Sequence, residues 1–237
     1  AHGSLFTGNF GSEIGVHGKS PDLDCEQSTL AEILCADGYT TRGFSANTYV
    51  SKYFEFDRGF ETFQNETRVV SGEESSFNWP KFIKEHKTDG PEKYAELLKE
   101  IRDSEANLLP TLRQGLKIKL EDLGILEDDR TYENGTKAIE YVDLTGFSSE
   151  GEFLFINLMD AHGPYIAPSE YQRADPADIS ATEMMMSGDP GDVSPEDVKA
   201  AYDDCARYLS DIYADLHSRL TSDFDYVITI ADHGEAF

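Results

Sequence analysis

Two short segments of the sequence place a carboxylate beside a histidine and a glycine. One reads DAHG at residues 160–163, and the other reads DHG at residues 232–234. A carboxylate oxygen and an imidazole nitrogen together suit a catalytic divalent metal, and glycine lets the backbone approach a ligand closely. A single pair is as easily a capping aspartate and a surface histidine. Two pairs in one chain favour metal-assisted chemistry.

Each segment follows an apolar run. EFLFINLMD at residues 152–160 is nearly continuous in apolar side chains, as in a strand covered on both faces of a sheet, and YVITIA at residues 226–231 predicts a second strand. The carboxyl ends of parallel strands share one edge of a sheet, where functional groups gather. We therefore expect His162, Asp232 and His233 to lie near one another at that edge.

The elements between these segments predict an α/β fold. STLAEILCADG (residues 28–38) indicates a short amphipathic helix capped by Ser28 or Thr29, and a strand is predicted in the YTTRGFSAN that follows. NGTKAIEYVDLTGF (residues 134–147) indicates another helix. Ser194 caps a long helix with apolar residues spaced by three and four. Alternating helices and strands are typical of a parallel sheet.

Two stretches depart from this alternation. Residues 65–130 contain polar helical segments with repeated breaks, which predicts a helical insertion within a single domain spanning residues 1–237. Residues 174–197 are rich in Asp, Pro, Gly and Ser and predict a surface loop.

The charge balance is strongly acidic. The chain has 46 Asp plus Glu against 20 Lys plus Arg, a net charge of −26. Self-repulsion of this size is screened over a Debye length of about 3 Å in 1 M salt, so we expect a protein of a halophilic microbe with an acidic proteome. A hydrophobic share of 39% argues against a disordered acidic chain. No basic stripe for nucleic acid or an anionic membrane is visible.

The sequence contains no apolar run long enough to span a membrane and no recognisable signal peptide. It begins at Ala1 rather than at an initiator methionine, so we expect its natural start to lie upstream. Export is therefore undecided, and a cytoplasmic location is the default expectation.

Five segments, in order, carry a family resemblance: AHGSLFTG, TLAEILCADGYTT, RGFETF, AHGPY and ADHGE. Together they resemble the sulfatases of the alkaline phosphatase superfamily, over nearly the whole chain, with residues 65–130 matching least. The resemblance implies an alkaline-phosphatase-like, mostly parallel sheet flanked by helices, here incomplete at both ends. It also implies sulfate ester hydrolysis through a covalent enzyme intermediate, with a divalent metal, Ca²⁺ in the family, at the carboxyl edge.

The resemblance also implies individual roles. Asp232 and His233 fall on the metal-binding pair of the family, and His162 falls on a histidine that contacts the sulfate and assists the leaving group. Alignment of the family's signature places His2 at its arginine and the nucleophile two residues before Ala1. His2 is thus expected to offer a cation or hydrogen-bond donor to the developing anion. Residues 1–237 alone are expected to be inactive.

Two departures from the family pattern keep other functions open. Ala46 stands at the catalytic lysine, so a neutral Asn47, or Lys52 nearby, would have to bind the sulfate. His2 in place of arginine does not favour formylglycine maturation, and the modified residue would lie outside this chain. The alternatives are a phosphoesterase or phosphotransferase with a Ser or Thr nucleophile and Zn²⁺ or Mn²⁺, or a non-catalytic anion-binding relative.

The expected substrate is a small-molecule or glycan sulfate ester. The sequence indicates neither the natural substrate nor the oligomeric state, and it offers no partner among nucleic acids.

Overall fold

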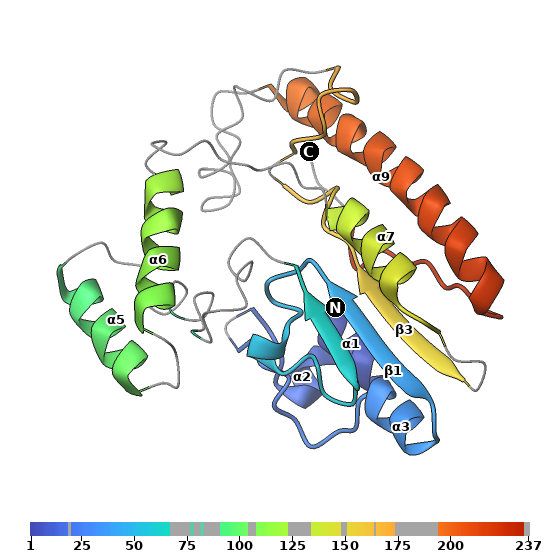
Figure 1. The fold of residues 1–237 in the computed structure, drawn as a ribbon, viewed down its shortest axis with the longest axis horizontal. Helices are drawn as coiled ribbons and strands as arrows, with labels where there is room; N and C mark the ends of the chain where they lie inside the picture. Colours follow the sequence, from blue (N-terminus) through green and yellow to red (C-terminus); the bar gives the residue numbers. More distant parts are fainter. Residues whose placement is uncertain are drawn as a thin grey trace.

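The computed structural model describes residues 1–18, 20–66, 77, 82, 91–103, 108–122, 134–147, 151–163, 165–173 and 194–234. They form a parallel sheet with helices on both faces, which confirms the α/β prediction (Figure 1). The strands are β1 (Thr40–Ser45), β2 (Thr62–Asn65) and β3 (Glu152–Asn157), in the spatial order β2-β1-β3.

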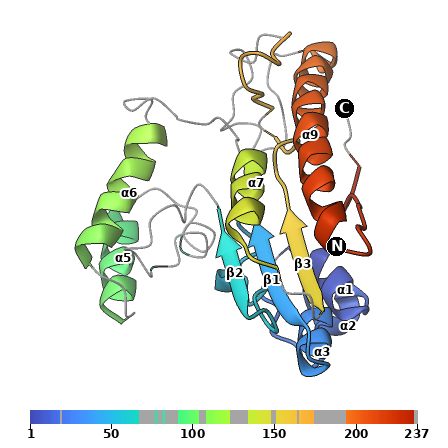
Figure 2. The same cartoon turned by 45° about the vertical axis from the view of Figure 1, so that its right-hand side comes forward.

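The helices are α1 (His2–Thr7), α2 (Gly11–Ile14), α3 (Leu30–Ala36), the short 3₁₀ turn η1 (Lys52–Phe54), α5 (Pro91–Asp103), α6 (Leu108–Asp122), α7 (Asn134–Leu144) and α9 (Pro195–Asp223). Helices α5 and α6 fall in the predicted insertion and lie to one side of the sheet in both views (Figures 1 and 2). Most of the predicted loop, residues 174–193, lies outside the described residues.

The register of the sheet brings three strand ends together. Strand β1 pairs in parallel with β2 and with β3, and Ser45 is the last paired residue on both sides, opposite Asn65 and Asn157. Because all three strands run in the same direction, their carboxyl ends meet at one edge. This is the edge at which the sequence predicts the site.

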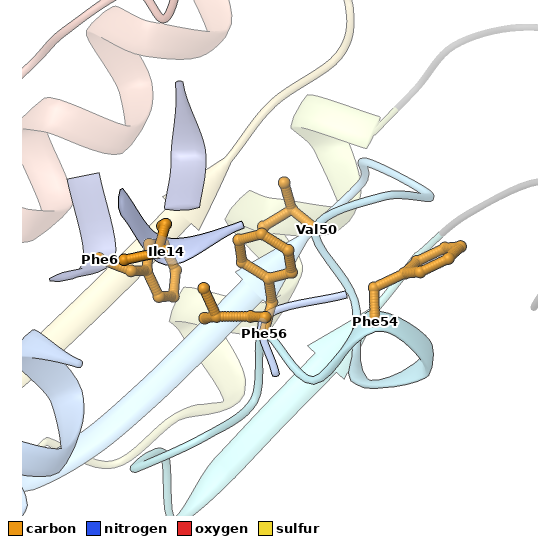
Figure 3. Close-up of a cluster of buried hydrophobic side chains, with 6 residues drawn as sticks. Phe6, Ile14, Val50, Phe54 and Phe56 are labelled. Atoms are coloured by element: carbon orange, nitrogen blue, oxygen red, sulfur yellow. The ribbon is translucent and has the colours of Figure 1, made fainter. Parts of the chain in front are cut away.

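Alternate residues of the strands face different layers. Phe44 of β1 packs with Ala138 of α7 and Ile212 of α9, and α7 and α9 lie side by side (Figures 1 and 2). The opposite face carries a second cluster, shown in Figure 3 and built from Phe6, Ile14, Leu23, Val50, Phe54 and Phe56. Strand β3 contributes to both clusters, but its residues are only half-buried, because it is an edge strand of the described sheet.

Helix α3 begins where its capping residues predict. The Oγ1 of Thr29 accepts a hydrogen bond from Glu32 N–H at 3.1 Å, and the Glu32 carboxylate accepts from Thr29 N–H at 2.8 Å, a reciprocal capping box. The predicted amphipathic helix would bury its large apolar side chains, and two of these are exposed in the structure. Ala31 is buried, whereas Leu30 and Ile33 are exposed.

Arg58 ties the loop after α2 to the start of α3. Its guanidinium donates to the carbonyl oxygens of Leu23 at 2.8 Å and Cys25 at 2.9 Å. It also donates to the carbonyl of Gln27 at 3.2 Å and to the Glu32 carboxylate at 3.1 Å. This one side chain thereby satisfies several backbone acceptors of a segment that has no regular secondary structure.

Helix α9 confirms the predicted long helix. Its first turn is capped by Ser194, whose Oγ accepts from Asp197 N–H at 3.1 Å. Its buried residues repeat at the expected spacing, for example Val198, Cys205 and Ile212. Across the described part of the chain, no helix combines the length and apolar character needed to cross a membrane.

The strand predicted at residues 226–231 is not formed. Tyr226 is 86% exposed and Ile228 is 84% exposed, and no strand in the described part of the chain pairs with this segment. The segment instead runs back along α9, where Thr229 Oγ1 and Tyr213 OH are hydrogen-bonded at 2.7 Å. The prediction was wrong because an apolar, β-branched sequence favours an extended backbone, but a strand also requires a neighbour for its ladder.

Candidate active site

The carboxyl edge of β3 brings together residues from both ends of the chain. His2 is the first residue of α1, and its Nδ1 lies 3.6 Å from Oδ2 of Asp232. Its other ring nitrogen, Nε2, lies 3.0 Å from Nδ2 of Asn157, the last residue of β3. Asp232 thus reaches the predicted edge even though the segment before it is not a strand.

His233 completes this cluster. Its Nδ1–H donates to the Gly234 carbonyl oxygen at 2.7 Å, which leaves Nε2 with the lone pair that a metal needs. That Nε2 lies 3.7 Å from Oδ1 of Asp232. Two ligands at this separation can share one cation at metal–ligand distances of about 2.0–2.4 Å. The Asp232 and His233 side chains are 39% and 62% exposed, so an ion can reach them from solvent.

These two side chains fit as part of a metal site. Within the residues that the structure describes, there is no group of three or more His, Cys, Asp or Glu placed to hold an ion. Asp232 and His233 would therefore be two ligands of a larger set.

The pKa of the His2 ring is shifted by its surroundings. Burial lowers the pKa of His2, the nearby Asp232 carboxylate acts in the opposite direction, and the net shift is downward from 6.5. The ring is therefore neutral at pH 7. It can make hydrogen bonds, but it does not supply the positive charge that the family's arginine would supply.

His162 lies in the turn after β3 and is exposed. Its Nδ1 is 2.7 Å from the Gly163 carbonyl oxygen, so Nδ1–H donates there and Nε2 is the nitrogen left for proton exchange. Within the described residues, no hydrogen bond or ion pair joins His162 to His2, Asp232 or His233. The role of His162 in contacting the sulfate and assisting the leaving group stays a prediction.

Asn47 follows the carboxyl end of β1. Its Oδ1 accepts from Tyr49 N–H at 2.9 Å in a tight turn, which holds the orientation of the amide, and Nδ2 is the group that can donate to a substrate. Ala46, at the family's lysine position, is buried, and its backbone N–H donates to the Asn157 carbonyl oxygen at 3.0 Å. The predicted substrate role of Asn47 therefore depends on its Nδ2 group alone.

Asn157 is a site residue that the sequence analysis missed. It is a single polar residue inside the apolar run EFLFINLMD, and a period-2 or period-3.6 pattern does not mark such a residue. The available signal was its place at the end of a buried strand, where polar groups meet the carboxyl edge.

Comparison with known protein families gives a match. A model of the Sulfatase family matches residues 3–237. The chain belongs to the sulfatase family. Neither a curated protein nor a solved structure matches the chain. The family match supports a sulfatase-like hydrolase and a sheet of the alkaline phosphatase superfamily type.

Asp160 of this sulfatase-family chain begins the turn that carries His162. It is 2% exposed, and its Oδ1 accepts from Gly135 N–H at 3.0 Å, which caps the first turn of α7. Its Oδ2 is buried and has no hydrogen-bond partner among the described residues. Burial raises the pKa of Asp160 to about 6 against the opposing hydrogen bond from Gly135. Burial raises the pKa of the Cys205 thiol to about 12, and the charge of Asp160 acts in the same direction.

We predict a pH-dependent stability contribution from Asp160. Because its folded-state pKa lies above the ordinary 3.8, the protonated carboxyl stabilises the fold below about pH 4. This contribution is lost as the pH rises through about 6, with a magnitude of about 3 kcal/mol. Asp160→Asn mimics the protonated carboxyl. The free energy of unfolding of both proteins is measured by urea denaturation in molar salt. Between pH 4 and pH 7.5, the value for Asp160→Asn should rise relative to the wild type by about 3 kcal/mol.

The exposed Asp225 provides the matched control. Asp225→Asn should leave the wild-type pH profile unchanged. If the Asp160→Asn and wild-type profiles run parallel between pH 4 and pH 7, the carboxyl does not titrate in this range.

Proposed function

We propose that this member of the sulfatase family is a metal-dependent sulfuric ester hydrolase. The observation that supports it most directly is the pair formed by Asp232 Oδ1 and His233 Nε2, 3.7 Å apart and beside the end of β3. A carboxylate and an imidazole whose Nδ1–H donates to a backbone carbonyl oxygen are the donor types that a catalytic divalent cation takes. Calcium is the ion that the family resemblance favours.

A divalent cation at this position would lower the pKa of the nucleophile and offset negative charge on the transferred sulfuryl group. Asp232 and His233 would hold it. His2 lies behind Asp232, where its half-buried ring contacts the other oxygen of the same carboxylate.

Two further residues would act on the ester. His162 would use Nε2 to protonate the leaving oxygen, since its Nδ1 is engaged by Gly163. Asn47 would donate from Nδ2 to a sulfate oxygen, with the orientation of its amide held by the hydrogen bond from Tyr49 N–H to Oδ1. The nucleophile would be supplied by residues preceding Ala1. The substrate would be a small-molecule or glycan sulfate ester, and the protein would work in molar salt.

The test is an ester-cleavage assay with the full-length protein. Aryl sulfate and aryl phosphate are compared in molar salt, before and after chelation and after readdition of Ca²⁺, Zn²⁺ or Mn²⁺. We expect sulfate cleavage that falls at least tenfold on chelation and is restored by Ca²⁺. Residues 1–237 alone should be inactive.

Other outcomes distinguish the alternatives. Faster turnover of the phosphate with Zn²⁺ or Mn²⁺ would assign a phosphoesterase. The presence of Ala46 at the position of the family's lysine favours this alternative. If neither ester is turned over, the remaining alternative is a non-catalytic, anion-binding relative. Appreciable cleavage by residues 1–237 would show that the nucleophile lies within them.

A further inference from the structure

Asn157 is held in place by the sheet itself. Its backbone carbonyl accepts from Ala46 N–H at 3.0 Å, and it is the residue of β3 that lies opposite Ser45 at the carboxyl edge. The backbone of a paired strand is among the most rigid parts of a fold. The direction of the Asn157 side chain is therefore set by the strand pairing rather than by a loop.

The side chain of Asn157 contacts His2 on the side away from Asp232. Nδ2 of Asn157 is 3.0 Å from Nε2 of His2, while Nδ1 of His2 is 3.6 Å from Oδ2 of Asp232. The His2 side chain is 14% exposed, so solvent does not compete strongly for either ring nitrogen. The three residues form a row from the strand to the candidate metal ligand.

The chemistry of this row selects one tautomer of His2. The amide nitrogen of asparagine only donates, so Nε2 of the ring has to accept through its lone pair. A neutral ring has one proton, which must then be on Nδ1, facing the Asp232 carboxylate. The opposite amide orientation would put a proton on Nε2 and turn the Nδ1 lone pair towards a negative charge. Asp232 therefore favours the orientation in which the amide nitrogen faces His2.

We propose that Asn157 is a positioning residue that holds His2 as the Nδ1–H tautomer and, through it, orients the Asp232 carboxylate. The inference rests on the proposed function only in giving Asp232 the role of metal ligand. In this proposal His2 orients the Asp232 carboxylate, whereas the family resemblance implied that His2 supplies a cation or donor to the sulfate. Partners behind a metal ligand typically change metal affinity or activity by 10–100-fold when they are removed.

The decisive measurement is the ring-nitrogen NMR spectrum of His2 in the full-length protein labelled with ¹⁵N-histidine. The His2 signals are assigned by their loss in His2→Gln. We expect a protonated Nδ1 and an unprotonated Nε2 in the wild type. Asn157→Leu removes the donor to Nε2 and should shift the ring towards the Nε2–H form that free neutral histidine favours, with Asp232 as the remaining group that favours Nδ1–H. An unchanged Nδ1–H ring in Asn157→Leu would show that Asp232 alone sets the tautomer and would overturn the role of Asn157. An Nε2–H tautomer in the wild type would overturn the proposal.

Asn65→Leu is the matched control. Asn65 ends β2 as Asn157 ends β3, and it donates to the Ser45 and Val50 carbonyl oxygens at 3.5 and 3.3 Å. It should perturb the sheet edge without changing the His2 tautomer. An equal change in both variants would mean that Asn157 has only a structural effect and would overturn the proposal.

Activity and Ca²⁺ affinity provide a second measurement, independent of the tautomer. Asn157→Leu should lower Ca²⁺ affinity, and kcat for aryl sulfate, by about 10–100-fold with little change in KM. Because the tautomer is measured without turnover, an inactive wild type with the Nδ1–H ring would count against the proposed function and leave the positioning role standing.

Discussion

Asp232→Asn is expected to lower kcat/KM for an aryl sulfate by about a thousandfold or more, because loss of a metal-ligand charge removes about 4 kcal/mol of transition-state stabilisation. The asparagine side chain is isosteric with aspartate but carries no charge, so the fold should be retained. The measurement combines steady-state kinetics with calorimetric titration of Ca²⁺ into the full-length protein. Both activity and Ca²⁺ binding should fail together.

The control for this result is Asp225→Asn, since Asp225 is an exposed carboxylate in the same terminal segment. It should retain wild-type activity and Ca²⁺ affinity. His233→Ala should resemble Asp232→Asn, whereas His217→Ala, on the exposed side of α9, should not. Wild-type activity in Asp232→Asn would remove the central residue of the proposed site.

The helix starts were predictable because their signals are local. Thr29 and Ser194 each accept a hydrogen bond from the backbone N–H three residues on, and both signals are legible in four consecutive letters of sequence. The β1 and β3 strands were also predictable, since each is short and bounded by turns. Local propensity and the final fold agree at these positions.

The terminal segment shows where local signals fail. Residues 226–231 have the composition of a strand, yet their extended backbone lies against α9 with Thr229 bonded to Tyr213. Strand pairing requires a neighbouring strand, and the sequence of residues 226–231 does not indicate whether one is present. Asp232 nevertheless lies 3.6 Å from His2, which contacts Asn157 at the end of β3.

The site was only partly predictable for a related reason. Asp232 and His233 form a visible motif, and the family resemblance gave both a role. Asn157 is an isolated polar residue within an apolar run, and Asp160 was visible only as part of the DAHG segment. The importance of both comes from contacts with His2 and Gly135 that join distant parts of the chain. Only a three-dimensional structure reveals such contacts.

Gly59→Ala is expected to destabilise the fold by about 4 kcal/mol or more, because the new methyl group would collide with backbone. An added Cβ would lie 2.1 Å from the Glu32 nitrogen and 2.6 Å from the Ala31 carbonyl carbon, at the start of α3. Backbone atoms of a capped helix cannot move aside as the end of a flexible side chain can. Urea unfolding in molar salt should show a large fall in midpoint, or the variant should fail to accumulate in soluble form.

Gly38→Ala separates the two causes of this effect. Gly59 has φ +82° and Gly38 has φ +91°, so alanine meets a similar left-handed strain at both, but nothing lies within 4 Å of a Cβ at Gly38. Left-handed strain alone costs about 1–2 kcal/mol. The difference between the variants therefore measures the close approach of the Gly59 backbone to α3. Equal losses of stability would mean that α3 can shift to admit a side chain, and that its contact with the segment before β2 does not fix its position.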